Sequence, residues 1–157
     1  MANDIIIADY EPRFRTAFKA LNEQWITQYF EMEESDHKAL DDPESYILDN
    51  GGRIIFALQD NEPVGVCALI KVNDPDYDFE LAKMAVSPKA RGKGIGEKLG
   101  KAVIQTARSM GARKIFLESN SKLQPALHLY EKLGFTRIYN RPTPYKRADV
   151  QMELDLD

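Results

Sequence analysis

The stretch Arg91-Gly92-Lys93-Gly94-Ile95-Gly96 decides how this sequence is interpreted. It follows a mostly apolar segment, residues 79–86, and leads into a segment with apolar residues at three- and four-residue steps. Glycines let backbone N–H groups approach an anion closely, and the first turn of a helix adds unpaired N–H donors and the positive end of the helix dipole. The stretch therefore predicts a phosphate-binding turn between a strand and a helix.

The charges around this turn agree with an anion site. Residues 89–101 hold five basic residues and one acidic residue, in a chain of 157 residues with a formal net charge of −4. Residues 1–80 contain 18 acidic and 6 basic residues, whereas residues 81–157 contain 7 and 15. An acidic first half attracts a cationic substrate, and a basic second half attracts an anionic cofactor or nucleic acid. The alternative is a solvated surface whose charges happen to segregate.

Two familiar phosphate-binding motifs do not fit these residues. A dinucleotide fingerprint that starts at Gly92 or Gly94 needs a further glycine where Glu97 or Leu99 stands. A P-loop needs Ser or Thr after its Gly-Lys pair, but Gly92-Lys93 is followed by Gly94. The sequence therefore argues against NAD and ATP sites of these kinds.

The order of the expected elements predicts an α+β fold, with a mixed, mostly antiparallel central sheet flanked by helices. The connections in the first half are too short for helical crossovers, so its strands pair antiparallel. One βαβ-like unit is expected near residues 79–119. The expected strands are 5–7, 53–59, 64–72, 79–86, 114–118, 135–139 and 150–154, and the expected helical segments lie within 14–30, 42–50, 95–110 and 125–133.

Composition favours one globular domain over residues 1–157, because 43% hydrophobic and 10% aromatic residues are too many for a disordered chain. Met1-Ala2-Asn3-Asp4 lacks the basic start of a secretory signal, and the apolar runs are shorter than a membrane span. We therefore expect a cytoplasmic protein with no membrane partner. The single cysteine, Cys67, is expected to be a buried small hydrophobe, and two isolated histidines predict no metal site.

These residues resemble the GNAT superfamily of N-acetyltransferases, which use acetyl-CoA. The matching residues are the run 81–86, Ser87-Pro88, Arg91-x-x-Gly94-x-Gly96 and, downstream, Ala126-x-x-Leu129-Tyr130-Glu131-Lys132-Leu133-Gly134-Phe135. The strong resemblance covers about residues 78–136, and the first 77 residues agree only in element order. It implies a GNAT-like acyl-CoA N-acyltransferase fold.

The resemblance also implies how acetyl-CoA is bound. Backbone amides of the turn would hold the pyrophosphate, pantetheine would run along the preceding strand, and the thioester would lie where that strand and the next splay apart. The Met84 N–H would then lie near the acetyl carbonyl as an oxyanion donor. Many family members carry an asparagine where Leu123 stands here, so Asn120 is the substitute candidate. The implied cofactor residues are Met84, Ala85, Val86, Arg91, Gly92, Lys93, Gly94, Ile95, Gly96 and Asn120.

Two residues are the candidate catalytic groups. By resemblance Tyr130 is the general acid that protonates the departing thiolate, since a phenol stays protonated at neutral pH. Its alternative is a core tyrosine packed with Leu127 and Leu133. Glu80 stands eleven residues before Arg91, an offset at which some family members place a catalytic carboxylate. Glu80 would be the base, with a substrate anchor or an exposed strand residue as alternatives.

The residues that would bind the acceptor amine form no diagnostic motif. Trp25, Tyr29 and Phe30, followed by an acidic run at 31–36, would suit a cationic amine. The simpler interpretation makes Trp25 a core residue and the acidic run a solvated loop. The basic loop 141–147 would close over the acceptor and favour a substrate that also bears a carboxylate.

The leading hypothesis is an N-acetyltransferase that transfers acetyl from acetyl-CoA to the primary amine of a small molecule, or of a peptide or protein, by direct attack and without metal. A non-catalytic acyl-CoA sensor is the alternative. Nucleic-acid binding is disfavoured, because the bases gather at one turn rather than along a helix with interleaved aromatics. The resemblance also allows a homodimer, a common assembly in the family.

Overall fold

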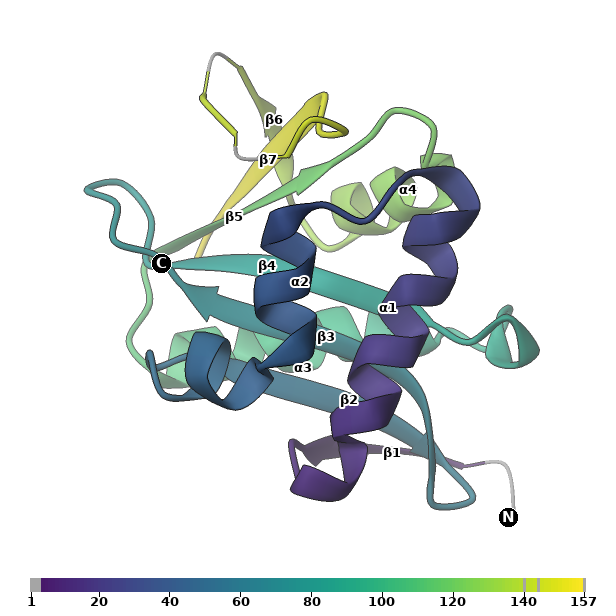
Figure 1. Cartoon of the computed structure of the whole chain (residues 1–157). Helices are drawn as coiled ribbons and strands as arrows, with labels where there is room; N and C mark the ends of the chain where they lie inside the picture. Colours follow the sequence, from purple (N-terminus) through teal and green to yellow (C-terminus); the bar gives the residue numbers. More distant parts are fainter. Residues whose placement is uncertain (1–3, 140, 144, 157) are drawn as a thin grey trace.

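The computed structural model describes residues 4–139, 141–143 and 145–156. It contains a seven-stranded sheet with helices on both faces (Figure 1). Residues 1–3, on which part of the argument against a signal peptide rests, and Pro144 of the basic loop lie outside the described residues.

The helices and strands follow the order expected from the sequence. The strands are β1 Ile5–Asp9, β2 Arg53–Gln59, β3 Glu62–Lys71, β4 Phe79–Val86, β5 Lys114–Ser119, β6 Thr136–Ile138 and β7 Val150–Asp155. The α-helices are α1 Arg15–Tyr29, α2 Glu34–Asp41, α3 Ile95–Ser109 and α4 Gln124–Lys132, with short helical turns at Pro12–Phe14, Glu44–Leu48 and Pro88–Ala90.

The strands lie in the order β1-β2-β3-β4-β5-β7-β6. Only the β4–β5 pair is parallel, and every other neighbouring pair is antiparallel. The expected mixed, mostly antiparallel sheet is therefore confirmed. Helix α3 connects β4 to β5 across one face of the sheet, as the expected βαβ-like unit requires.

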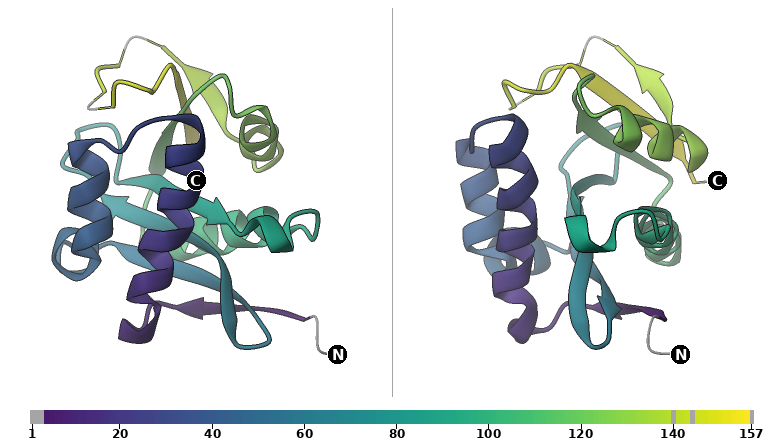
Figure 2. Two further views of the ribbon diagram at one scale, coloured as in Figure 1. Left: turned by 45° about the vertical axis from the view of Figure 1, so that its right-hand side comes forward. Right: turned by 90° about the vertical axis from the view of Figure 1, so that its right-hand side faces the viewer.

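Two apolar clusters hold the helices against the sheet. Helices α1 and α2 cover one face, where Phe18 and Leu40 are buried, and α3 covers the other face with Leu99 and Val103 (Figure 2). Helix α4 lies on the α3 side of the sheet and packs against the C-terminal strands. Cys67 is fully buried in the α3-side cluster, as expected, and burial raises the pKa of its thiol.

The acidic run was expected to be a solvated loop, and this interpretation is wrong. Its second part forms α2, which begins with a capping box between Glu33 and Asp36, and Asp36 is 0% exposed. Trp25, expected in the core, is half-buried and packs at the border of the α1-side cluster. The helical segment expected at 42–50 is only the short π-helical turn Glu44–Leu48.

Strands β4 and β5 are joined over a very short distance. Their register includes only Phe79 with Ile115 and Glu80 with Phe116, although both strands continue beyond these pairs. The strands therefore splay apart after Glu80, as the family resemblance implied. The gap between the two strands connects one face of the sheet with the other.

A bulge in β4 lies beside this gap. The register with β3 shifts between Val66 and Ala68, so that Lys83 and Met84 both lie opposite Cys67, and Lys83 has a φ of +54°. The bulge interrupts the alternation of the strand. Consequently the Lys83 side chain lies on the same face as Asp36 of α2, while Met84 packs in the α3-side cluster.

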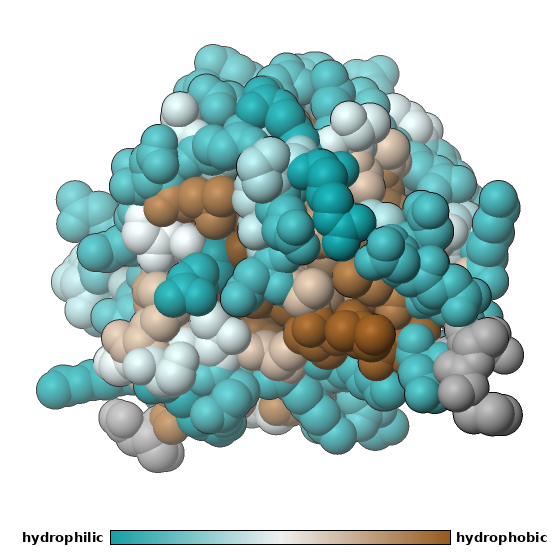
Figure 3. Space-filling view, turned by 90° about the horizontal axis from the view of Figure 1, so that it is seen from below, coloured by the Kyte–Doolittle hydropathy of each residue, from teal (hydrophilic) through white to brown (hydrophobic). Residues whose placement is uncertain are grey.

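Figure 3 views the molecule from the β1 edge of the sheet. Apolar residues are exposed there among hydrophilic ones. Ile6 is 60% exposed at this edge. No helix in the described part of the chain combines the length and the apolar character that crossing a bilayer requires.

Candidate active site

A cavity of about 670 Å³ occupies the gap between β4 and β5. Side chains from both faces of the sheet and from α1, α3 and α4 line it. Nearly all the predicted site residues border this one space. They are Glu80, Met84, Ala85, Val86, Arg91, Gly92, Gly94, Ile95, Gly96, Asn120 and Tyr130. Lys93 is the exception, because its Nζ points away and lies 3.4 Å from Gln59 Oε1.

The glycine-rich turn forms the end of the cavity at the start of α3. Gly92 and Gly94 have φ values of +82° and +72°, and a Cβ built on either would meet no atom within 4 Å. Glycine is therefore required there for backbone conformation rather than for close packing, and the space above the turn is open. The first N–H groups of α3 have no partner within the helix, so the turn offers donors for an anion.

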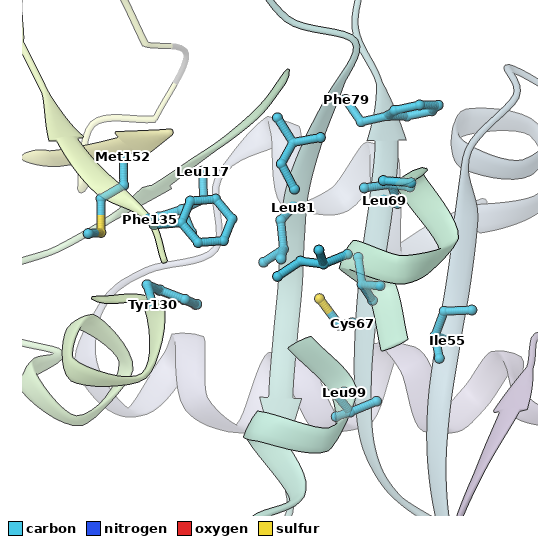
Figure 4. Packing of buried hydrophobic residues seen from close by; sticks show 14 of the residues in the cluster. Ile55, Cys67, Leu69, Phe79, Leu81, Leu99, Leu117, Tyr130, Phe135 and Met152 are labelled. Atoms are coloured by element: carbon cyan, nitrogen blue, oxygen red, sulfur yellow. The ribbon is translucent and has the colours of Figure 1, made fainter. Parts of the chain in front are cut away.

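Tyr130 enters the cavity from the α3 side. Its side chain is 8% exposed, its ring meets Phe135 edge-on with centroids 6.2 Å apart, and it points from α4 toward the sheet (Figure 4). Burial, and to a smaller extent the neighbouring Cys67, raise the pKa of the phenol. Tyr130 thus belongs to the apolar core and also borders the cavity, a position that is compatible with both sequence interpretations.

Glu80 enters the cavity from the other side, at the last residue of β4 that pairs with β5. Burial and, to a smaller extent, the negative charge of Glu118 raise the pKa of its carboxyl, Lys83 opposes both effects, and the resulting pKa is about 7. A carboxyl with this pKa exchanges its proton near neutral pH. Glu80 is thus chemically suited to accept a proton.

Asn120 lies at the end of β5, where sequence analysis expected a substitute for the missing asparagine. Its Nδ2 donates a hydrogen bond to the Arg147 carbonyl, and its Oδ1 accepts one from the Lys122 N–H at 2.8 Å. These bonds fasten the segment before β7 to the turn before α4. Asn120 borders the cavity while both ends of its amide are already paired within the protein.

Sequence analysis missed a buried ion cluster on the α1–α2 side of the cavity. Lys83 Nζ lies 2.6 Å from Asp36 Oδ1, and the Arg147 guanidinium donates two hydrogen bonds of 2.6 Å to the two oxygens of Asp36. Burial alone would raise the pKa of Asp36, but hydrogen bonds from Arg147 and Lys83 hold it well below its usual range. Burial lowers the pKa of Lys83, and Asp36 offsets part of that effect. A lysine within the otherwise apolar run 81–86 was the available signal.

The basic loop 141–147 does not present free arginines to the cavity. Arg141 pairs with Asp74 at 2.7 Å and stacks against Tyr77 and Phe116, outside the cavity lining. Arg147 borders the cavity but is held by Asp36 and, at 3.4 Å, by Glu33. The expectation that this loop favours a carboxylate on the substrate therefore loses its physical basis.

Comparison with known proteins now identifies the family. The family described as acetyltransferase (GNAT) matches residues 17–135, more than half of the chain. The chain belongs to the GNAT acetyltransferase family. The family predicted from the motifs at 81–99 and 126–135 is thereby confirmed. Among the residues that the structure describes, no group of three or more His, Cys, Asp or Glu side chains could hold a metal ion.

Relatives and solved structures agree with this assignment. An uncharacterized N-acetyltransferase of Escherichia coli, YjgM, is 38% identical over 80 residues, 50% of this chain and 48% of that protein. N-acetyltransferase 8F1 of Rattus norvegicus is 34% identical over 97 residues, 60% of this chain and 44% of that protein. The chain thus spans about half the length of the curated relatives it matches.

The solved structures share the fold at low sequence identity. A GNAT-family acetyltransferase from Staphylococcus aureus Mu50 has a TM-score of 0.88 and 22% identity, covering 98% of this chain and 100% of that one. YncA of Salmonella typhimurium, solved with acetyl-CoA, has a TM-score of 0.80 and 20% identity, covering 99% and 95%. The GNAT-like fold is therefore confirmed.

Proposed function

We propose that this protein transfers the acetyl group of acetyl-CoA to the primary amine of a small molecule by direct attack. One observation carries the proposal. A single cavity joins the anion-binding turn, the unpaired part of β4, Tyr130 from one side of the sheet and Glu80 from the other. The solved relative with bound acetyl-CoA supports the choice of cosubstrate by analogy.

The cofactor would lie along the turn and β4. Backbone N–H groups of 92–96 would receive the pyrophosphate oxygens, with Arg91 beside them. Beyond Glu80, β4 has no partner on its β5 edge, so its backbone polar groups there are available to pantetheine. The Met84 N–H would bond the thioester carbonyl oxygen as negative charge develops, and a donor of this kind lowers the barrier by about 3 kcal/mol.

The chemistry follows from the two side chains. The amine nitrogen attacks the carbonyl carbon while Glu80 receives a proton from the nitrogen, directly or through water. The C–S bond then breaks, the sulfur keeps the electron pair, and Tyr130 donates its hydroxyl proton to that sulfur. An alkyl amine is about 0.1% neutral at pH 7, which adds roughly 4 kcal/mol before attack. A carboxyl that titrates near neutral pH offsets part of this barrier.

A direct assay tests the proposal. Purified protein is mixed with acetyl-CoA and a panel of primary amines, the released CoA thiol is followed, and acetylated product is identified by mass spectrometry. Amine-dependent thiol release at the rate of product formation is expected. Stable acetyl-CoA binding without acetylation of any amine would overturn the proposal and favour the sensor. Retention on DNA at physiological salt would instead favour the nucleic-acid alternative.

A homodimer and a cytoplasmic location stay predictions. Sedimentation analysis of the purified chain and imaging of a tagged copy in cells test them.

A further inference from the structure

The acceptor half of the cavity, on the α1–α2 side of the sheet, contains an unequal set of charges. Glu80 and Glu118 border the cavity, and the carboxylates of Glu33 and Asp36 lie behind the lining residue Arg147, with which both are paired. Two buried or half-buried cations accompany them, Lys83 and Arg147, which lie on β4 and on the segment before β7. How these charges pair determines which ligand charge the site accepts.

Asp36 occupies both cations. Its carboxylate is 0% exposed and receives Lys83 Nζ at 2.6 Å, together with a two-pronged contact from Arg147 at 2.6 Å and 2.6 Å. A planar guanidinium held at both prongs has little capacity left for a second carboxylate. Tyr145 covers the ammonium of Lys83, with its ring centroid 4.9 Å from Nζ. Neither cation is therefore free to bind an anion.

Glu80 and Glu118 stand outside this ion cluster. Within the described residues neither makes an ion pair, and Glu118 accepts only the Gln151 side-chain amide at 2.9 Å. Both border the cavity, and the charge of Glu118 is felt at Glu80. Two carboxyl groups outside any ion pair, Glu118 and the ionised fraction of Glu80, favour a cation in this partly buried space and repel an anion.

Aromatic side chains form the wall of the same space. Trp25, Tyr29 and Phe30, at the end of α1, border the cavity. Aromatic faces accommodate both apolar groups and cations. One further cation, Lys122, stands at the rim, exposed to solvent and 5.7 Å from the Phe30 ring centroid, where water screens its charge.

We propose that Asp36 is a specificity-determining residue, which neutralises Lys83 and Arg147 so that the acceptor site takes a cationic amine with an apolar, aromatic-sized body and no carboxylate. This inference rests on the proposed function, because it concerns the acceptor of that reaction. It reverses the preference for a carboxylate-bearing substrate that the basic loop suggested from sequence.

Matched ligand pairs test the charge preference. Phenethylamine and phenylalanine differ only in the carboxylate, as do tyramine and tyrosine. Calorimetric titration into protein saturated with CoA is expected to show that each amine binds at least about tenfold more tightly than its amino acid. Equal or tighter binding of the amino acids would overturn the inference, and would mean that Lys122 or another cation receives the carboxylate.

The same pairs separate this inference from the proposed function. Binding in the presence of CoA needs no turnover, so a protein that prefers the amines but acetylates none of them supports the inference and refutes the enzyme. Conversely, faster acetylation of the amino acids supports the enzyme and refutes the inference.

Substitution of Asp36 tests its role. Asp36→Asn leaves Lys83 without an ion pair and Arg147 with only its 3.4 Å contact to Glu33, so the ratio of amine to amino-acid affinity should fall at least about tenfold. Asp36→Glu, which keeps the charge, should restore part of the ratio. Asp74→Asn is the matched control, because it frees Arg141 outside the cavity and should leave the ratio unchanged. An unchanged ratio in folded Asp36→Asn would overturn the role of Asp36.

A second variant covers the case in which Asp36→Asn does not fold. Glu118→Gln keeps the buried cluster intact and removes one uncompensated carboxylate. It should weaken phenethylamine binding several-fold and leave phenylalanine binding the same or tighter. Equal weakening of both ligands would contradict the inference.

Discussion

The two halves of the cavity differ in how the chain builds them. The cofactor half centres on six consecutive residues, 91–96, whose backbone does the binding in our proposal. The acceptor half is assembled from α1, α2, β4, β5 and the segment before β7, and its contacts join residues as far apart as Asp36 and Arg147. A site made of local backbone is visible as a motif, whereas a site made of distant side chains becomes visible only in the folded chain.

The largest expected effect comes from the base in the acceptor half. Glu80→Gln should lower kcat/KM at pH 7 by about 10²- to 10⁴-fold, because the amine loses its proton acceptor. Acetyl-CoA affinity, measured by calorimetry, should be unchanged. Glu62→Gln, an exposed glutamate at the start of β3, is the control. If Glu80→Gln raises KM and leaves kcat unchanged, Glu80 is a substrate anchor instead.

Tyr130 tests whether the cofactor half contributes chemistry as well as binding. Tyr130→Phe keeps the ring and its packing on Phe135 but removes the hydroxyl, so kcat should fall about 10²-fold with little change in acetyl-CoA affinity. Steady-state kinetics with saturating acetyl-CoA measures the effect. Tyr139→Phe, at a residue that is 70% exposed, should change nothing. An unchanged kcat would leave Tyr130 as a core residue only.

The backbone character of the cofactor half is tested at glycine. Gly94→Ala places a side chain at a φ of +72° beside the proposed pyrophosphate, and should weaken acetyl-CoA binding about tenfold in a calorimetric titration. Gly111→Ala is the matched control, because φ there is +82° and its surroundings are equally open. Both variants should lose about 1–2 kcal/mol of stability. Equal acetyl-CoA affinities would contradict phosphate binding at the turn.

The smallest effect is a shift in a pH profile. Glu118 raises the pKa of Glu80, so Glu118→Gln should move that pKa from about 7 toward the ordinary 4.5. The ionised form of Glu80 is the base, so the acid limb of kcat/KM should move to lower pH while the plateau at higher pH keeps its position. Lys83 and Tyr145 also face Glu80 and stay unchanged in this variant. If the acid limb does not move, the charge of Glu118 does not influence the pKa of the catalytic base.

Particular residues show where sequence was sufficient. The spacing of apolar residues along α3 and the glycines within 92–96 are local properties of the sequence. The βαβ-like unit, the turn and the family could therefore be predicted. The bulge at Lys83 could not, because it arises from a register shift against β3 that no local pattern records. Nor could the burial of Asp36, because it depends on ion pairs with Lys83 and Arg147, and both residues are distant from Asp36 in the sequence.

The short β4–β5 ladder also bears on how the molecule moves. Strands β1–β4 and β5–β7 are joined at one end only, by the pairs of Phe79 and Glu80 and by the hydrogen bond from the Asp78 N–H to the Lys114 carbonyl. Acetyl-CoA bound between β4 and β5 would provide hydrogen-bond partners for backbone groups that the two strands do not pair with each other. Bound acetyl-CoA would then stabilise the whole sheet against local opening. Without the ligand, amide hydrogens should exchange fastest along the unpaired edge of β4.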